Sequence, residues 1–188
     1  MIDRYSRPEM KEIWSENNKY RIWCDIEGFA CEAQAKLGFI PKTALKSILQ
    51  ARKLIFDPKK IESIEKITKH DVIAFLSYVA DQLGEDSRFL HKGMTSSDVL
   101  DTCFSVQLAA SADLLISGID GLLTVLDRRA HEHKNTICIG RSHGVHAEPT
   151  TFGLKLAQAY AEMERNKNRL RNARSEINIG AISGAVGT

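Results

Sequence analysis

A long stretch without proline, from about Asp98 to His133, constrains the fold most. Apolar residues recur along it mostly at intervals of three and four, the period of one helix face. They are Val99, Cys103, Val106, Ala110, Leu114, Leu122 and Val125. A helix of this length spans roughly 50 Å, more than an ordinary globular helix. The pattern therefore predicts a helix that belongs to a bundle.

A second long helix is predicted from about Thr151 to past Arg171. Two long antiparallel helices cannot bury their apolar stripes against short helices alone, so we expect further long helices from the same chain or from other subunits. The chain ends on "NIGAISGAVGT", which is typical of a chain cut in mid-fold. This glycine-rich stretch lacks the Lys-Ser/Thr and the preceding strand of a phosphate-binding loop.

The N-terminal half is predicted to form shorter helices. Their expected boundaries are Ser15 to Gly38, a start at Pro41, a cap at Asp57 followed by Pro58, and Asp71 to Leu83 before Gly84. Ile61, Ile64 and Ile67 are expected on one face. Strands are at most incidental, because no segment shows sustained period-two alternation. The prediction is an all-α fold, with an N-terminal helical domain over residues 1–95 and the start of a central long-helix bundle, incomplete at its C-terminus, over residues 96–188.

Composition and charge narrow the possible partners. The net charge of +2 is too small to indicate a nucleic-acid or membrane partner. The basic run from Lys167 to Arg174 is interpreted as a solvated helix face. The N-terminus is unlike a signal peptide, and no apolar run is expected to reach the length of a membrane span. The four widely spaced cysteines indicate free thiols, so a cytoplasmic protein is expected.

The segment "GRSHGVHAEPTTFG", residues 140–153, carries more chemistry than a helix connector needs. It could be a catalytic centre, a metal site or a turn. A metal site fails on spacing: His131 and His133 would point to different helix faces, and the chain has no Cys pair or HExxH arrangement. A general acid or base is more economical, because an imidazole titrates near neutrality.

Two further stretches suit anions. In "DRYSRPEM", the Arg4 fork beside the Tyr5 phenol could bind a phosphate or carboxylate, or be part of a polar arm. In "TKHDV", Asp71 is a plausible helix cap with surface neighbours. Alternatively, Lys69 and His70 are aimed at an anion bound at the helix N-terminus.

A third stretch, "HKGMTSSDV", starts at His91 and leads into the long helix. Thr95 and Asp98 resemble an imperfect capping box. Capping explains one hydroxyl but not the run of three that includes Ser96. Hydroxyls and free backbone N–H groups at a helix N-terminus are suited to hold a carboxylate or phosphate.

Together these stretches resemble the adenylosuccinate lyases, a family of the fumarase/aspartase superfamily. The family's Arg-Tyr-Ser-x-Pro-x-Met is matched by residues 4–10, and its His-Asp pair by His70 and Asp71. Its Gly-x-Thr-Ser-x-Asp is matched by residues 93–98, and its His-Gly-x-His-Ala-x-Pro-Thr-Thr-Phe-Gly by residues 143–153. The resemblance covers the whole chain in the right order, including "ISGAVGT".

The resemblance implies a β-elimination that breaks a C–N bond and releases fumarate, from adenylosuccinate and from a succinyl-carboxamide ribotide. It also implies a homotetramer, with no metal or organic cofactor. It makes His143 the general acid, with His70 as its supporting partner, while His146 helps to shape the loop. Substrate contacts are expected from Arg4, Tyr5, Lys69, Asp71, His91, Thr95 and Ser96.

The chain departs from the family pattern in three ways. Lys69 stands where many relatives have Arg, which exchanges a bidentate fork for a point charge. Ser142 replaces a commoner Thr. The mobile Ser-Ser-x-Met-Pro-x-Lys-x-Asn-Pro loop, whose serine is the family's general base, is absent, so the chain alone is expected to be inactive. Alternatives are another lyase of the superfamily (argininosuccinate lyase, fumarase or aspartase) or a non-catalytic helical assembly module.

Overall fold

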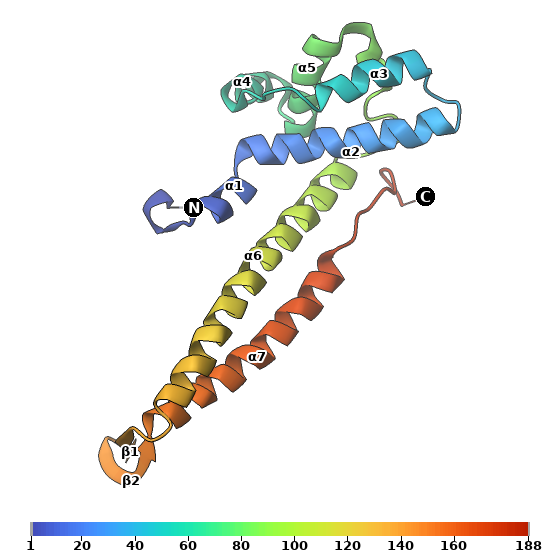
Figure 1. Cartoon of the computed structure of the whole chain (residues 1–188). Helices are drawn as coiled ribbons and strands as arrows, with labels where there is room; N and C mark the ends of the chain where they lie inside the picture. Colours follow the sequence, from blue (N-terminus) through green and yellow to red (C-terminus); the bar gives the residue numbers. More distant parts are fainter. Residues whose placement is uncertain (1, 188) are drawn as a thin grey trace. The chain divides into compact units, whose positions relative to one another are not determined.

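The computed structural model describes residues 2–187, and most of them are helical (Figure 1). The short helical turns are η1 (Asp3–Tyr5) and η2 (Gly84–Phe89). The helices and strands are α1 (Pro8–Ile13), α2 (Glu16–Lys36), α3 (Lys42–Ala51), α4 (Pro58–Thr68), α5 (Asp71–Leu83), α6 (Ser96–Glu132), β1 (Ile137–Ser142), β2 (Val145–Thr151) and α7 (Phe152–Ile177). The predicted all-α class and both long helices are confirmed, and the only sheet among the described residues is one hairpin.

Two compact units divide the chain: Met1–Leu108 with Asn178–Thr188, and Ala109–Ile177. Helix α6 contributes residues to both. This division follows contacts within the chain. The boundary at residue 95, which concerns the domains of a complete protein, stays a prediction.

Aromatic packing holds the first unit together. Trp23 on α2 is 2% exposed and meets Phe75 of α5 edge-on, with ring centroids 5.4 Å apart. Tyr20 stacks on the same Phe75 ring at 5.8 Å. Val99 and Cys103, from the first turns of α6, are buried in this cluster. The apolar stripe that predicted α6 is therefore covered at its N-terminal end.

Most of the predicted helix boundaries of this unit are confirmed. The Ser15 side chain accepts a hydrogen bond from the Asn18 N–H, and Asp57 caps α4. Two details differ. His70, not Asp71, is the N-cap of α5, because its ring nitrogen accepts from the helix. Ile67, expected on one face with Ile61 and Ile64, is 83% exposed, whereas Ile61 is fully buried.

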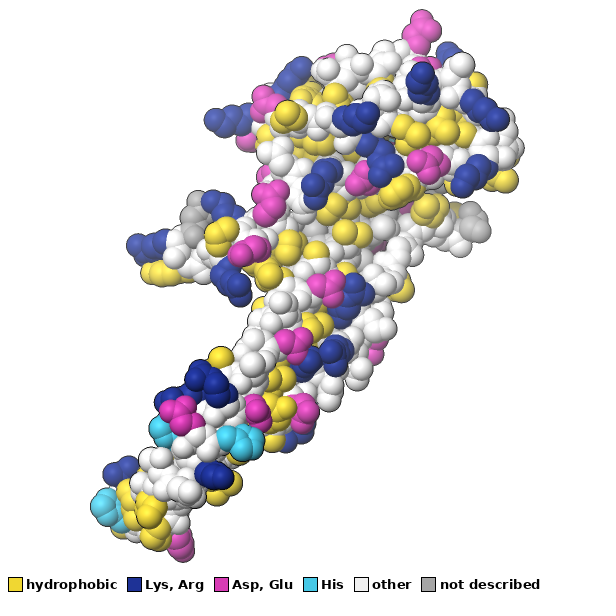
Figure 2. Space-filling model, viewed as in Figure 1, with side chains coloured by type: hydrophobic (Ala, Val, Ile, Leu, Met, Phe, Trp, Pro, Cys, Tyr) yellow, Lys and Arg dark blue, Asp and Glu magenta, His cyan; other side chains and the backbone are white. Residues whose placement is uncertain are grey.

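The second unit has little core of its own. Arg174 of α7 holds Asp113 of α6 with two hydrogen bonds of 2.8 and 2.9 Å, and Lys167 pairs with Asp120. Two members of the basic run thus join α7 to α6, which corrects their interpretation as a solvated face. The apolar side chains Leu115, Leu122, Val125 and Leu154 stay exposed. Figure 2 shows yellow, hydrophobic side chains along α6 and α7.

Helix α6 also corrects one expectation. It contains an 18-residue stretch that is apolar enough, by length and composition alone, to cross a membrane. The core helix of a large soluble bundle has the same composition, so this property does not by itself indicate a membrane. The ion pairs that Asp113 and Asp120 make with α7 fit a helix packed against protein.

Candidate active site

His70 and Ser96 meet at the solvent-facing start of α6. His70 caps α5: its Nδ1 accepts from the Ile73 N–H at 3.4 Å. In the neutral ring this leaves the proton on Nε2, which lies 3.2 Å from Ser96 Oγ. Asp71 Oδ1 is 3.3 Å from the same Nδ1, so it can accept a hydrogen bond from the protonated ring. The structure thus brings together three of the predicted site residues.

Lys69 fixes the corner between α4 and α5. Its φ of 55° lies in the left-handed region, which costs a residue with a side chain roughly 1 kcal/mol. Its N–H closes α4 onto the Glu65 carbonyl at 2.8 Å. Strain of this kind persists where the surroundings enforce it and is often found at functional sites. The corner turns the chain so that His70 can begin α5.

Asp98 organises the N-terminus of α6. Its carboxylate is 1% exposed and accepts from the Thr95 N–H at 2.9 Å, as the capping-box pattern predicts. It also accepts from the N–H groups of Ser183 and Gly184, at 2.8 and 3.2 Å. Burial pushes the pKa of Asp98 upward, but these hydrogen bonds outweigh it and hold the pKa below its usual value. The backbone N–H of Thr95 is therefore occupied, whereas the Ser96 hydroxyl faces His70.

His91 is held by a residue that the sequence did not single out. Glu27 on α2 is 2% exposed and accepts from the His91 backbone N–H at 2.8 Å. The other oxygen of Glu27 lies 2.6 Å from His91 Nδ1. This hydrogen bond raises the pKa of His91, burial opposes the rise, and the Glu27 charge adds to it. His91 adopts a φ of 58°, so Glu27 secures a strained turn and Nδ1 of His91 is not available to a substrate.

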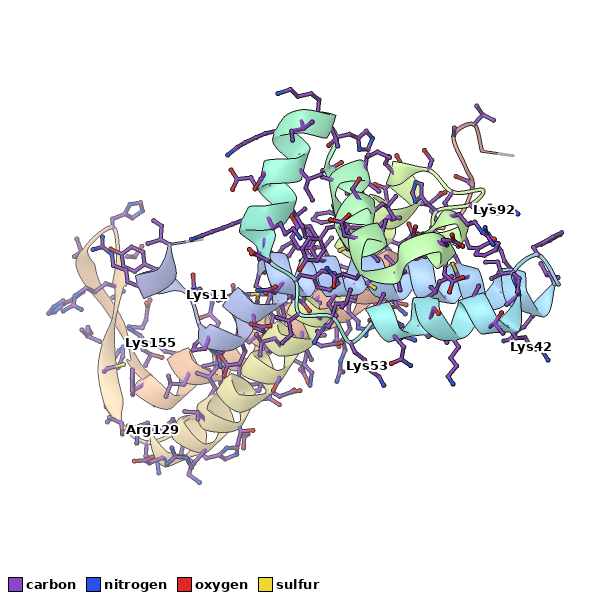
Figure 3. All side chains as sticks on the ribbon, turned by 90° about the horizontal axis from the view of Figure 1, so that it is seen from above. Lys11, Lys42, Lys53, Lys92, Arg129 and Lys155 are labelled. Atoms are coloured by element: carbon purple, nitrogen blue, oxygen red, sulfur yellow. The ribbon has the colours of Figure 1, made fainter. Side chains whose placement is uncertain are left out.

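The same turn is tied down at Lys92, which is labelled in Figure 3. The Lys92 carbonyl accepts from Gln34 Nε2 at 2.7 Å, so α2 holds the turn at two places. Arg4 and Tyr5 lie in η1, where the guanidinium stands 4.8 Å from the ring centroid. Among the described residues they contact each other and not the His70–Ser96 pair.

His143 sits at the tip of a β-hairpin in the second unit. The sequence predicted a loop here, but β1 and β2 pair antiparallel with Ser142 opposite Val145. The turn is His143-Gly144, with φ values of 52° and 75°. Positive φ at both positions is the type I′ geometry that suits the twist of a two-residue hairpin. The imidazole is therefore presented at an exposed tip, with His146 opposite Arg141 further down the ladder.

The glycines at the two ends of this segment allow close backbone contacts. A Cβ on Gly140 would lie 2.8 Å from the Glu148 carbonyl oxygen across the hairpin. A Cβ on Gly153 would lie 2.4 Å from the Ala130 oxygen at the end of α6. His133 supports the same junction, since its ring packs edge-on against Phe152 at 5.2 Å. Gly153 and His133 thus hold the hairpin close to the end of α6 and the start of α7.

The remaining histidines do not form a metal centre within residues 2–187, where no group of three or more His, Cys, Asp or Glu side chains converges. His133 Nδ1 lies 3.1 Å from Thr136 Oγ1, and His131 Nδ1 lies 3.0 Å from the Asp127 carbonyl. Their contacts are those of structural residues. His143 belongs to the second unit and His70, Thr95 and Ser96 to the first.

Known proteins resemble this chain along its whole length. Residues 3–188 match the family described as "Lyase". Adenylosuccinate lyases of Aquifex aeolicus and Bacillus subtilis are 50% and 48% identical to it over 100% of the chain. The chain spans 43% of the length of these curated relatives.

Solved structures agree with the fold. A 3-carboxy-cis,cis-muconate lactonizing enzyme from Pseudomonas putida superposes with a TM-score of 0.92 at 27% identity, covering 100% of this chain and 44% of its own. A fumarate lyase from Mesorhizobium sp. BNC1 gives 0.90 at 28% identity, covering 98% and 45%. The fold of this chain is thus found in enzymes that are named for different reactions.

Proposed function

The chain belongs to the lyase family, and on that premise we propose that it is the N-terminal portion of an adenylosuccinate lyase. The observation that carries this proposal is the identity of about half, along the whole chain, to adenylosuccinate lyases. The complete protein would release fumarate from adenylosuccinate, giving AMP, and from the succinyl-aminoimidazole-carboxamide ribotide of purine nucleotide biosynthesis.

The reaction is an elimination whose charges must be stabilised. A base removes a proton from the carbon next to the C–N bond, that electron pair forms the C=C bond of fumarate, and the C–N pair leaves on nitrogen. The intermediate carbanion is stabilised when the neighbouring carboxylate takes up its charge. Preorganised donors around that carboxylate contribute the largest catalytic effect. We assign this role to Thr95 and Ser96 at the N-terminus of α6, where the helix dipole favours an anion.

His143 is proposed to protonate the departing nitrogen. A positioned imidazole contributes about a hundredfold or more to such a step. Its exposed place at a hairpin tip supports the role, because the ring is open to a bound molecule. His70 would support the transfer: its Nε2 lies beside Ser96, and Asp71 Oδ1 lies 3.3 Å from its Nδ1. The general base would come from a part of the complete protein outside this chain.

Nucleotide binding is proposed for the cationic and phenolic residues of the first unit. The Arg4 guanidinium and the Tyr5 phenol suit a phosphate of the nucleotide. Lys69 provides a positive point charge next to His70. Asp71 keeps a supporting role. His91 is proposed to act through the turn that precedes Thr95, because its Nδ1 is bound to Glu27. The reaction as proposed needs no metal or organic cofactor.

Assembly is proposed through the long helices. The exposed apolar side chains of α6 and α7 need cover, and a homotetramer with a shared central bundle would provide it. The divide between an N-terminal domain over residues 1–95 and a bundle from residue 96 onward belongs to the same proposal. A cytoplasmic location fits free cysteines at Cys24, Cys31, Cys103 and Cys138.

A substrate panel tests the proposal on the complete protein. Fumarate release should be fast from adenylosuccinate and slow or absent from argininosuccinate, aspartate and malate. Preference for one of the latter would identify another lyase of the superfamily. A complete protein that assembles but releases fumarate from none of them would favour a non-catalytic assembly module.

A further inference from the structure

Asp98 joins two segments that are far apart in the sequence. One oxygen, Oδ2, accepts from both the Thr95 and the Gly184 N–H groups, at 2.9 and 3.2 Å. The other, Oδ1, accepts from the Ser183 N–H at 2.8 Å and lies 3.5 Å from the Ser183 hydroxyl. The turn before α6 and the glycine-rich segment 180–184 are thus linked through a single buried carboxylate.

A second contact keeps the same segment along α6. Thr102, one turn after Asp98, accepts from the Ala181 N–H at 3.0 Å and its hydroxyl lies 3.3 Å from the Ala181 carbonyl. Gly180 lies so close that a Cβ there would stand 3.2 Å from Thr102 Cγ2. The glycine-rich segment therefore rests on the first turns of α6 in a defined register.

Only an acceptor fits at the position of Asp98. Three backbone N–H groups converge on its two oxygens, and an ionised carboxylate accepts at both. An asparagine has the same shape, but its NH₂ group would face one of these donors. The hydrogen bonds also hold the pKa of Asp98 low, so the carboxylate stays ionised near neutrality.

We propose that Asp98 is a positioning residue for the substrate-carboxylate site. It fixes the Thr95–Ser96 turn against segment 180–184, and it sets the place of the Ser96 hydroxyl opposite His70 Nε2. Asp98 itself is 1% exposed, so its role is to position other groups and not to contact a substrate. This inference rests on the proposed function, because it assigns to Asp98 the alignment of residues that the proposal gives to substrate binding.

The test compares Asp98→Asn with Asp101→Asn in the complete protein. Asp101 is the matched control, since it is an exposed aspartate on the same helix. With adenylosuccinate as substrate, we expect Asp98→Asn to lower kcat/KM by about tenfold or more. Asp101→Asn should stay within about twofold of the wild type. The kcat/KM of each variant is calculated from the concentration of folded protein, and its unfolding temperature is measured as well.

A double-mutant cycle with Ser96→Ala separates positioning from general stabilisation. If Asp98 acts through the turn, Asp98→Asn should cost much less activity in the Ser96→Ala background than in the wild type. Additive losses, or a lowered unfolding temperature with unchanged kcat/KM, would overturn the inference. If Asp98→Asn does not fold, Thr102→Val loosens the same segment. It should lower kcat/KM at least about threefold, with the same non-additivity, and full activity would overturn the inference.

The two proposals fail in different ways. A wild-type complete protein without activity on adenylosuccinate overturns the proposed function and this inference with it. An active wild type with a fully active Asp98→Asn variant overturns only the inference.

Discussion

Replacing Glu27 by glutamine should weaken the first unit through its contact with His91. The carboxylate is 2% exposed and makes two contacts to this one residue, at 2.8 Å to the backbone N–H and 2.6 Å to ring Nδ1. Removing one partner of a buried pair costs about 3–5 kcal/mol. Glutamine keeps the shape of the side chain and one acceptor oxygen, so the variant should lose about as much stability as one charge-assisted hydrogen bond provides. We therefore expect Glu27→Gln to lower the free energy of unfolding by about 2 kcal/mol.

Glu32→Gln is the matched control on the same helix. Its carboxylate lies 3.8 Å from Arg52 and is one-third exposed, so this pair should contribute below about 0.5 kcal/mol. Urea unfolding followed by tryptophan fluorescence measures both variants. Trp14 and Trp23 are the only tryptophans, and both lie in the first unit, so the signal reports on that unit. In thermal unfolding, Glu27→Gln should lower the midpoint by roughly 4–8 °C.

The pH dependence has a defined sign. The pKa of His91 is raised in the folded chain, chiefly by its hydrogen bond to Glu27. The stabilisation from protonated His91 is therefore complete below its unfolded pKa of about 6.5 and is lost as the pH rises through the folded value. The difference in stability between the wild type and Glu27→Gln should therefore narrow as the pH rises above about 6.5. Equal effects of Glu27→Gln and Glu32→Gln, or a difference that widens with pH, would refute this reasoning.

Two further outcomes are expected of the 188-residue chain. Gly153→Ala should destabilise the second unit by about 1–3 kcal/mol in circular-dichroism melts, because its Cβ would overlap the Ala130 oxygen. The control Gly121→Ala, in open space on α6, should be neutral or stabilising, and equal losses at both sites would contradict the steric argument. The chain alone should release almost no fumarate from adenylosuccinate. Turnover near that of the complete protein would show that no base outside residues 1–188 is needed.

The long helices could be predicted because their signal is local. A repeated apolar face without proline fixed both ends of α6 to within a few residues, and the second long helix was placed equally well. The hairpin was missed because β1 and β2 carry few alternating apolar residues. A signal was present, since His143-Gly144 resembles the X-Gly pairs of type I′ turns. A glycine flanked by short polar strands should therefore be tested as a hairpin.

The long-range contacts of the supporting carboxylates were missed for a different reason. Their partners lie far along the chain: Glu27 binds a residue 64 positions later, and Asp98 binds Ser183, 85 positions later. Spacing in the sequence cannot reveal such contacts. Glu27 did leave a trace, because it continues the stripe of buried α2 residues formed by Tyr20, Cys24 and Cys31. An acid within an apolar stripe indicates a buried partner, although not which one.

Replacing His143 by glutamine in the complete protein tests the central claim most directly. That claim is that this chain supplies the proton donor of a fumarate-releasing elimination. With adenylosuccinate as substrate, kcat should fall by about a hundredfold or more while KM changes only a few-fold. A variant whose kcat stays within a few-fold of the wild type, with the loss confined to KM, would show that His143 only binds substrate and would contradict the account.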